Sequence, residues 1–302
     1  MTAYQRERIK TEKKPSWLKV KLPSHPHFFS VSSLLKEKGL NTICQSARCP
    51  NQAECWSQKT ATFLILGNIC SRRCSFCAVQ KGLPLTLSQE EPEQVAETVA
   101  SFGLSYAVVT SVTRDDLDDG GASQFTRTVR AIKRRISEAK VEVLIPDFNG
   151  NENALNEVIR AKPDVLSHNL ETTEALYPQI NRPVEYYRRS LKVLEKAGEM
   201  GILTKSGLMA GLGETEEELF QTFKDLRSVA CSLLTIGQYL QPTRASIPVR
   251  KYYSPQEFTS LRKAALSLGF KEVVSGPLVR SSFHARQLYD SCAKAIVPSC
   301  AI

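Results

Sequence analysis

The sequence has no long apolar run, and none near its start. No stretch of about 18 consecutive apolar residues occurs, which predicts that no helix spans a membrane. Residues 1–14 are polar and charged, unlike the apolar core of a secretory signal. A strict short repeat is also missing, which excludes collagen-like and coiled-coil chains. We therefore expect a globular cytoplasmic protein without a membrane partner.

Familiar catalytic signatures are missing as well. The sequence contains no phosphate-binding P-loop and no Ser-His-Asp hydrolase signature. Its four histidines do not form the H-E-x-x-H pattern of zinc proteases, and we expect them to be structural or to support the residues that hold the site's ligands. These histidines are His25, His27, His168 and His284.

The composition is that of a globular protein with a basic surface. Of the 302 residues, 42% are hydrophobic and 24% are charged, enough for a large core. The net charge of +9 fits either a well-hydrated basic surface or an acidic partner or anionic ligand. Aromatic residues are not interleaved with the basic ones, so we expect no nucleic-acid partner.

Short apolar runs alternate with helical patterns from residue 58 onward. Near-continuous apolar character is typical of strands buried on both faces of a parallel sheet. The predicted strands are Thr60–Leu66, Tyr106–Val112, Val141–Ile145, Asp164–Asn169, Ile202–Met209 and Leu233–Leu240, with Glu272–Ser275 as a possible seventh. The predicted helices are Pro92–Phe102, Ala122–Ala139, Asn151–Ala161, Val184–Ala197 and Thr215–Val229.

This alternation predicts an α/β fold, a partial (β/α)6-type TIM barrel with N-terminal and C-terminal extensions. An open doubly wound sheet remains the alternative. We expect an N-terminal extension over residues 1–57, the barrel over 58–270, and a C-terminal extension with a last strand and a short helix over 271–302. Pro15, Pro23 and Pro26 indicate an extended segment that lies over another surface.

Nine cysteines are many for a chain without an export signal, and six of them lie within residues 44–77. In a reducing compartment, such clustering favours metal binding or catalysis over disulfides. The sharpest motif is Cys70-Ser-Arg-Arg-Cys74-Ser-Phe-Cys77, directly after the first predicted barrel strand. Three thiolates on a short loop can bind three irons of a 4Fe–4S cluster and leave the fourth iron open to a small molecule. A zinc site and inert core cysteines are the alternatives.

A second trio, Cys44, Cys49 and Cys55, precedes the first predicted barrel strand. Its C-x4-C-x5-C spacing differs from that of the first trio. Two incomplete sets so close together indicate two clusters, whereas three spare thiols in a linker are the alternative reading.

The C-x3-C-x2-C motif, with an aromatic residue before its last cysteine, resembles the radical S-adenosylmethionine (SAM) superfamily. This resemblance implies that SAM binds the open iron and is cleaved reductively to a radical that abstracts hydrogen from unactivated carbon. It also implies an external electron donor such as ferredoxin or flavodoxin.

Motifs along the whole chain are similar to those of the lipoyl synthase family within this superfamily. They are KPSWLKVKLP, LNTICQSARCPNQAECW, CSRRCSFC, SVTRDDLDDGGA, VEVLIPDFNG, SHNLET, GLMAGLGET, QYLQPT and GPLVRSSFHA. Another radical SAM enzyme with an auxiliary cluster, or an iron–sulfur electron carrier, are the alternatives.

The resemblance implies a sulfurtransferase reaction. Two sulfur atoms enter carbons 6 and 8 of an octanoyl group on a lysine of a lipoyl carrier domain. The carriers would be the E2 subunits of 2-oxoacid dehydrogenases and the glycine cleavage H protein, which are generally acidic. A second 4Fe–4S cluster is the sulfur donor, and a serine is its fourth protein ligand.

By the same resemblance, Ser282 of the RSSFH segment is that ligand, with Ser281 as the fallback; a pair of serines in a turn is the structural alternative. Phe283 stands where the family usually has tyrosine. Asn169, Glu171, Arg182 and Gly211 are expected near SAM, although Glu171 and Arg182 could equally be a surface pair.

The remaining motifs carry weaker expectations. The aspartates of the TRDDLDDGGA loop could suggest a divalent cation site, but a polar loop at the barrel mouth is favoured. Cys231 is expected to be buried, and Cys292 and Cys300 have no assigned role.

Overall fold

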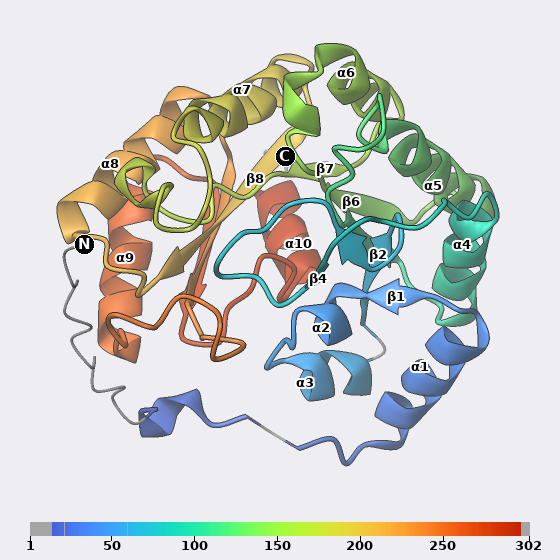
Figure 1. The fold of residues 1–302 in the computed structure, drawn as a ribbon, viewed down its shortest axis with the longest axis horizontal. Coiled ribbons are helices and arrows are strands. Elements are labelled where there is room, and N and C mark those ends of the chain that lie inside the picture. Colours follow the sequence, from blue (N-terminus) through green and yellow to red (C-terminus); the bar gives the residue numbers. More distant parts are fainter. Residues whose placement is uncertain (1–13, 21, 59, 297–302) are drawn as a thin grey trace, which may run out of the picture.

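The structure, a computed structural model, describes residues 14–20, 22–58 and 60–296 and is built around one large sheet (Figure 1). The strand order is β1-β2-β5-β6-β7-β8-β9-β10. These strands are β1 Asn41–Thr42, β2 Thr62–Ile65, β5 Tyr106–Ser111, β6 Lys140–Leu144, β7 Val165–Ser167, β8 Leu203–Ala210, β9 Leu233–Gln238 and β10 Glu272–Gly276. Every neighbouring pair is parallel except β1 and β2, which are antiparallel.

Six helices lie outside this sheet and follow the strands in βα order, as Figure 1 shows. They are α4 Glu91–Ser101, α5 Ala122–Arg135, α6 Glu152–Arg160, α7 Glu185–Glu199, α8 Glu216–Ser228 and α9 Pro255–Ser267. Local sequence explains their starts: Thr215 and Ser254 form capping boxes with Glu218 and Glu257, at α8 and α9. The predicted partial barrel is thus confirmed, and all seven predicted strands are present.

The N-terminal part is more helical than the sequence suggested. It contains the 3-10 turn η1 Ser16–Leu18 and the helices α1 Pro26–Glu37, α2 Ile43–Ser46 and α3 Gln52–Ser57. Pro26 was expected in an extended segment but is the first residue of α1, where a missing N–H costs nothing. Helix α9 was not predicted either. Pro15 does have an extended backbone.

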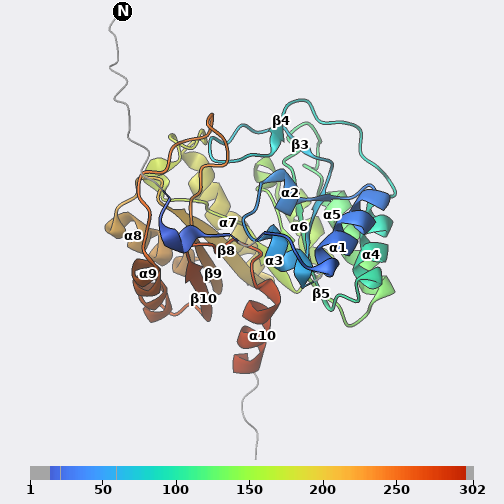
Figure 2. The same ribbon diagram turned by 90° about the horizontal axis from the view of Figure 1, so that it is seen from below.

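Helix α10, Ala285–Ile296, lies at the opposite end of the barrel from the small strand pair β3 Ile69–Cys70 and β4 Gln80–Lys81 (Figure 2). Its Leu288 and Cys292 pack with Leu233 of β9 in one buried cluster. The Tyr289 ring lies 5.7 Å from that of Tyr106 at the start of β5. The N-terminal ends of the strands are therefore covered by the segment that follows the RSSFH motif.

Strands β6 and β8 carry a buried ion pair that the sequence did not indicate. Lys205 Nζ lies 2.5 Å from Glu142 Oε1, and both side chains are almost fully buried. The Tyr106 hydroxyl donates to Glu142 Oε2 at 2.7 Å. Each charge in this network thus has a close partner, which offsets its desolvation.

Within the described residues, no helix has both the length and the apolar character needed to cross a membrane.

Candidate functional site

A cavity of about 560 Å³ lies at the C-terminal ends of the barrel strands. Ser111 of β5, Leu144 of β6, Met209 of β8 and Gln238 of β9 line it. Active sites of TIM-type barrels occupy this end because the βα loops converge there. The cavity is therefore where the predicted site residues should meet.

Cys70, Cys74 and Cys77 all line this cavity; Cys70 is the last residue of β3, and the other two lie on the loop from β3 to β4. Two backbone hydrogen bonds of Ser75 hold the loop: its N–H donates to Ile180 O at 3.0 Å, and its carbonyl accepts from Ile247 N at 3.1 Å. The loop that carries the three thiols is thus tied to segments far away in sequence.

The three thiols lie close enough to affect one another's ionisation. The pKa of Cys77 is raised to about 11, first by burial and then by the negative charge of Cys74 and Cys70. Thiolates bind metal, so three of them would repel one another here unless a cationic centre were bound. This donor set fits a cluster in which each thiolate binds a different iron.

Arg182 places a buried cation beside this trio. Its Nε donates to Cys74 Sγ at 3.3 Å, and its Nη2 lies 4.0 Å from Glu171 Oε1. Burial lowers the pKa of Arg182, but the charges of Cys74 and Glu171 outweigh burial and raise it. Arg182 and Glu171 are thus not the surface pair that the sequence left open, because both side chains are largely buried and line the cavity.

The second trio is gathered around α2 and α3. Cys44 lies in α2 and Cys55 in α3, and the Cys49 N–H donates to Cys44 O at 2.9 Å. Burial raises the pKa of Cys44 to about 11 and that of Cys55 to about 12, with charge on neighbouring trio members adding to both. Three buried thiols with mutual repulsion are the same kind of donor set as the first trio.

The RSSFH segment lies beside this second trio, more than 200 residues away in the sequence. The charge of Arg280 acts on Cys49 and opposes the rise of the thiol's pKa that burial causes. Asn51 Nδ2 donates to Leu278 O at 2.6 Å, and His284 Nε2 lies 3.8 Å from Glu54 Oε1. These contacts join the two segments predicted to hold one cluster.

Of the two serines in this segment, Ser281 lines the cavity and Ser282 is not among its lining residues. The Phe283 N–H donates to Arg280 O at 2.9 Å in a turn around them. The choice of Ser282 as the ligand stays a prediction.

In the part of the chain that the structure describes, no three His, Cys, Asp or Glu side chains are placed to hold a single metal ion. Three of the four aspartates of the TRDDLDDGGA loop instead bond to other groups of the protein. Asp115 binds Arg72, Asp116 binds Arg114, and Asp119 accepts from the backbone N–H groups of Gly121 and Ser123.

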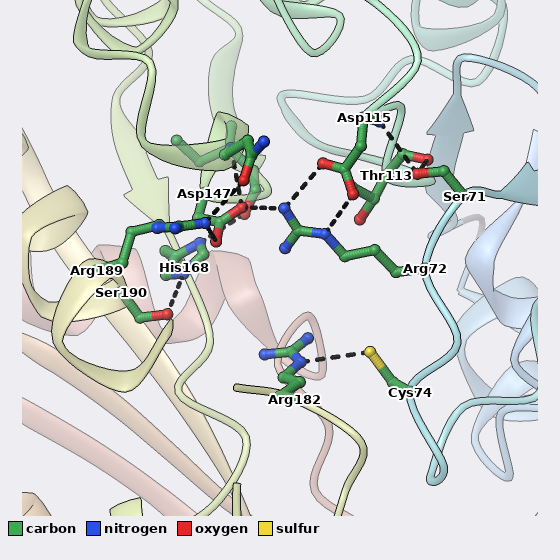
Figure 3. A network of polar contacts seen from close by, with 12 residues as sticks. Ser71, Arg72, Cys74, Thr113, Asp115, Asp147, His168, Arg182, Arg189 and Ser190 are labelled. Carbon is green, nitrogen blue, oxygen red and sulfur yellow. Dashed lines mark hydrogen bonds and ion pairs between the residues drawn. The ribbon is translucent and has the colours of Figure 1, made fainter. Parts of the chain in front are cut away.

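Arg72 connects the thiol loop to the barrel, as Figure 3 shows. Its guanidinium binds Asp115 through two hydrogen bonds, Nε to Oδ2 at 2.7 Å and Nη2 to Oδ1 at 2.9 Å. The same Nη2 lies 2.5 Å from Asp147 Oδ1, and Arg189 of α7 reaches the other oxygen of Asp147 at 3.4 Å. Four chain segments therefore meet around one arginine.

Tyr186 covers this network, because the guanidinium carbons of Arg72 and Arg189 lie 5.1 and 4.2 Å from its ring centre. Burial lowers the pKa of Arg72, but the hydrogen bonds and charges of Asp115 and Asp147 outweigh burial and raise it. The arginine is thus held as a cation at the cavity wall.

Asn169 and Glu171 lie in the cavity wall after β7. The Asn169 Nδ2 donates to Glu171 Oε1 at 3.5 Å, whereas its buried Oδ1 has no partner. A Cβ on Gly207 would lie 2.7 Å from that oxygen, so only glycine leaves room for Asn169 there. A buried polar atom without a partner is costly, which fits a ligand that supplies a donor.

Gly211 does not line the cavity. Its N–H and those of Leu212 and Gly213 donate to the Glu214 carboxylate. The glycine-rich turn therefore binds its own glutamate, and contact of Gly211 with SAM stays a prediction.

Several cavity-wall residues had no individual role in the sequence analysis. They are Arg48, Arg72, Asp147, Tyr186 and Arg280. Arg72, Asp147 and Arg280 do lie in the motifs CSRRC, VEVLIPDFNG and GPLVRSSFHA. The motifs therefore indicated that these residues belong to the site, but not which residues they contact.

Comparison with known sequences identifies the family. The family model described as the Radical SAM superfamily matches residues 64–226. A lipoyl synthase of Rubrobacter xylanophilus is 51% identical over 91% of this chain and 86% of its own length. One of Caldanaerobacter subterraneus is 53% identical over 91% of this chain and 96% of its own length. The chain belongs to the lipoyl synthase family.

The fold of this lipoyl synthase family member is similar to those of solved structures with little sequence identity to it. Methylornithine synthase (PylB) aligns with a TM-score of 0.53 at 14% identity, over 70% of both chains. Streptococcus suis SuiB bound to S-adenosylmethionine aligns with a TM-score of 0.54 at 11% identity, over 79% of this chain and 57% of SuiB. At this identity the likeness concerns the fold alone. The sequence-based prediction of the family is thus confirmed at two levels, superfamily and family.

Proposed function

We propose that the cavity at the barrel mouth is the active site of a lipoyl synthase reaction. In this family, two sulfur atoms are inserted at carbons 6 and 8 of a protein-bound octanoyl-lysine, with SAM and two 4Fe–4S clusters. The chain is accordingly a radical SAM sulfurtransferase that acts on octanoylated carrier proteins.

One observation supports this placement above all others. The first trio of thiols lies in the cavity wall, and Arg48, Pro50, Arg280 and Ser281, which flank the second trio and the serine motif, lie in the same wall. Cys44, Cys49 and Cys55 do not line the cavity themselves, but the segments that carry them border it, so a substrate carbon in the cavity would lie near both cysteine regions. An electron carrier needs no such cavity beside its thiols.

Residue roles follow from this arrangement. Cys70, Cys74 and Cys77 hold the cluster that binds SAM. Cys44, Cys49 and Cys55 hold the auxiliary cluster, with Ser282 as the fourth ligand and Ser281 as the alternative. Bound together, the clusters and SAM supply the carbon radical and the sulfur.

The protein itself supplies charge and positions the groups that react. Arg182 donates to Cys74 and stabilises thiolate charge, while Asn169 and Glu171 offer polar contacts to the amino and carboxyl groups of SAM. Ser282 would hold the auxiliary cluster through a hard oxygen, which is a poorer ligand for iron than thiolate. Gly211 is proposed to lie at the SAM site, where the absence of a Cβ, which would meet Gln238 and Lys251 at 2.3 and 2.4 Å, lets the backbone turn.

The finer assignments are part of the same proposal. The carriers are E2 subunits of 2-oxoacid dehydrogenases and the glycine cleavage H protein, and the electron donor is a ferredoxin or flavodoxin. The location is the cytoplasm. The parts are the extension 1–57 with the auxiliary cysteines, the barrel 58–270, and the extension 271–302.

An anaerobic product assay tests the function. The reconstituted enzyme is incubated with reductant, SAM and an octanoylated carrier domain, and mass spectrometry follows the octanoyl group. We expect a lipoylated carrier and 5′-deoxyadenosine. Formation of 5′-deoxyadenosine without sulfur in the carrier would instead support a different radical SAM enzyme.

A further inference from the structure

A short, exposed and basic segment borders the active-site cavity. Residues Lys14, Leu18 and Val20 are among the residues that line the cavity. We call residues 14–20 and 22 the entrance strip. Its Leu18 is buried, which anchors the strip, and Trp17 Nε1 donates to Tyr253 O at 3.2 Å. Packing and a hydrogen bond thus hold the entrance strip against the barrel at the mouth of the cavity.

Apolar side chains of the entrance strip face solvent. Trp17 is 42% exposed, Val20 is 49% exposed and Leu22 is 86% exposed. Three large apolar side chains so close in sequence are unusual on a free surface and are typical of an interaction site. A tryptophan next to basic residues is also a typical centre of binding energy in protein interfaces.

The charge of the entrance strip has one sign. No aspartate or glutamate occurs between Glu12 and Glu37. Lys14 and Lys19 are exposed, and within the described residues neither forms an ion pair. Arg48 adds a further cation in the cavity wall, held to Pro242 O at 3.2 Å. This surface is therefore complementary to an acidic partner.

The substrate chemistry requires a partner at this place. An octanoyl-lysine is a long flexible arm on a folded domain, and the domain is too large for a cavity of about 560 Å³. The body of the domain must therefore rest at the mouth while only the arm reaches inside. The entrance strip is a surface that borders the cavity and is both apolar and basic.

We propose that the entrance strip is the docking surface for the octanoylated carrier domain, through an acidic and partly apolar face of that domain. This inference rests on the proposed function. Trp17 and Val20 pack against the carrier, and Lys14 and Lys19 attract its carboxylates. Recognition of the folded domain is thereby separate from recognition of the octanoyl arm inside the cavity.

Two substrates separate docking from catalysis. One is the octanoylated carrier domain, and the other is a short octanoyl-lysyl peptide of neutral net charge. The variants are Trp17→Ala and Lys19→Glu in the full-length, reconstituted enzyme. Matched controls are Met200→Ser and Lys192→Glu, which change exposed residues on α7 or directly after it. Iron content and circular dichroism verify that each variant is folded and loaded.

We expect each entrance-strip variant to raise the dissociation constant of the carrier domain about tenfold, in line with loss of one interface anchor or charge contact. Single-turnover sulfur insertion into the peptide stays within twofold of the unsubstituted enzyme, and both controls bind the domain normally. Binding by Lys19→Glu also depends less on ionic strength, because a screened attraction has been removed.

Three outcomes would overturn the docking proposal. Unchanged domain binding in both variants would place the docking surface elsewhere. Equal losses for domain and peptide would mean that the strip shapes the cavity instead. If the unsubstituted enzyme inserts sulfur into neither substrate, the proposed function is wrong, and the docking proposal fails with it. If it inserts sulfur into the peptide, the proposed function holds, and only the docking proposal is then tested by the variants.

Discussion

His168 is a buried histidine that the fold keeps neutral. Its Nδ1 lies 2.8 Å from Ile145 O, to which it donates, and its Nε2 therefore accepts from Ser190 Oγ at 2.9 Å. Burial is the largest cause that lowers its pKa from 6.5 to about 4, against the opposing charge of Asp147. A neutral ring satisfies both neighbours without a second N–H.

This shift predicts a pH-dependent stability. As pH falls below 6.5, the unfolded chain binds a proton at His168 and the folded protein does not until about pH 4. The contribution of neutral His168 to the free energy of unfolding is therefore fully present above pH 6.5 and is lost on acidification. Between pH 7.5 and pH 5 the free energy of unfolding should fall by about 2 kcal/mol from this cause.

Urea unfolding of the reconstituted protein at both pH values measures this loss. In His168→Gln the amide can replace both hydrogen bonds without titrating, so the loss on acidification should shrink by about 2 kcal/mol. An equal loss in both proteins would contradict a depressed pKa.

Gly207 is a second residue whose role can be tested in isolation. An alanine Cβ would lie 2.7 Å from Asn169 Oδ1 and 3.0 Å from Thr235 Oγ1. Gly207→Ala should destabilise the protein by about 1–3 kcal/mol and weaken SAM binding, because Asn169 must move. Gly198→Ala in α7, with nothing nearer than 3.9 Å, should stabilise by about 0.5–1 kcal/mol. Thermal unfolding and SAM titration measure both effects.

At the scale of elements, the thiol loop depends on the Arg72 network for its position. Arg72→Lys keeps the charge but loses the planar, two-point contact with Asp115. We expect about a tenfold or larger loss in the rate of SAM cleavage, with iron content retained, because small displacements of reacting groups are costly.

Arg73→Lys is the matched control, since Arg73 is the exposed neighbour whose side chain has no described partner. Electron paramagnetic resonance of the reduced, SAM-bound enzyme should change in Arg72→Lys and not in Arg73→Lys. Normal spectra and normal SAM cleavage in Arg72→Lys would show that the network is dispensable.

The two cysteine segments should fail in different ways. Cys74→Ala should abolish SAM cleavage and spare the second cluster, whereas Cys49→Ala should allow SAM cleavage without sulfur insertion. Each variant should lose about four irons per chain. Iron analysis and assays of 5′-deoxyadenosine and lipoylated product measure this, and equal loss of both activities in Cys49→Ala would contradict divided roles.

The elements also show what sequence can and cannot predict. Strands such as Tyr106–Ser111 were predictable because burial on both faces favours runs of apolar and β-branched residues. Helix α1 was missed because Pro26 was interpreted as part of an extended segment, although proline is favoured at a helix start.

Contacts between distant segments needed the structure. The motifs predicted which residues belong to the site, but the bond from Arg72 to Asp147 depends on how the barrel brings the loops together. The Lys205–Glu142 pair was missed for a related reason: each charge is unfavourable alone in a buried strand, and only strand register places them together.

For the whole molecule, two clusters predict a definite metal content. Anaerobically reconstituted protein should contain about eight irons and eight sulfides per chain. Because the second trio and the RSSFH segment come from opposite ends of the chain, removing iron with a chelator should also lower the melting temperature by several degrees. A melting temperature that does not respond to iron would show that the clusters do not join these segments.

The position of α10 has a practical consequence for work with this enzyme. The helix ends at Ile296, at the far end of the barrel from the cysteine loop (Figure 2). Lys14, by contrast, lines the cavity. A tag joined beyond Ile296 is thus attached to the described chain on the side remote from the cavity, while one joined ahead of Lys14 is attached beside the cavity and the proposed docking surface. Purification handles for assays with whole carrier proteins therefore belong at the carboxyl terminus.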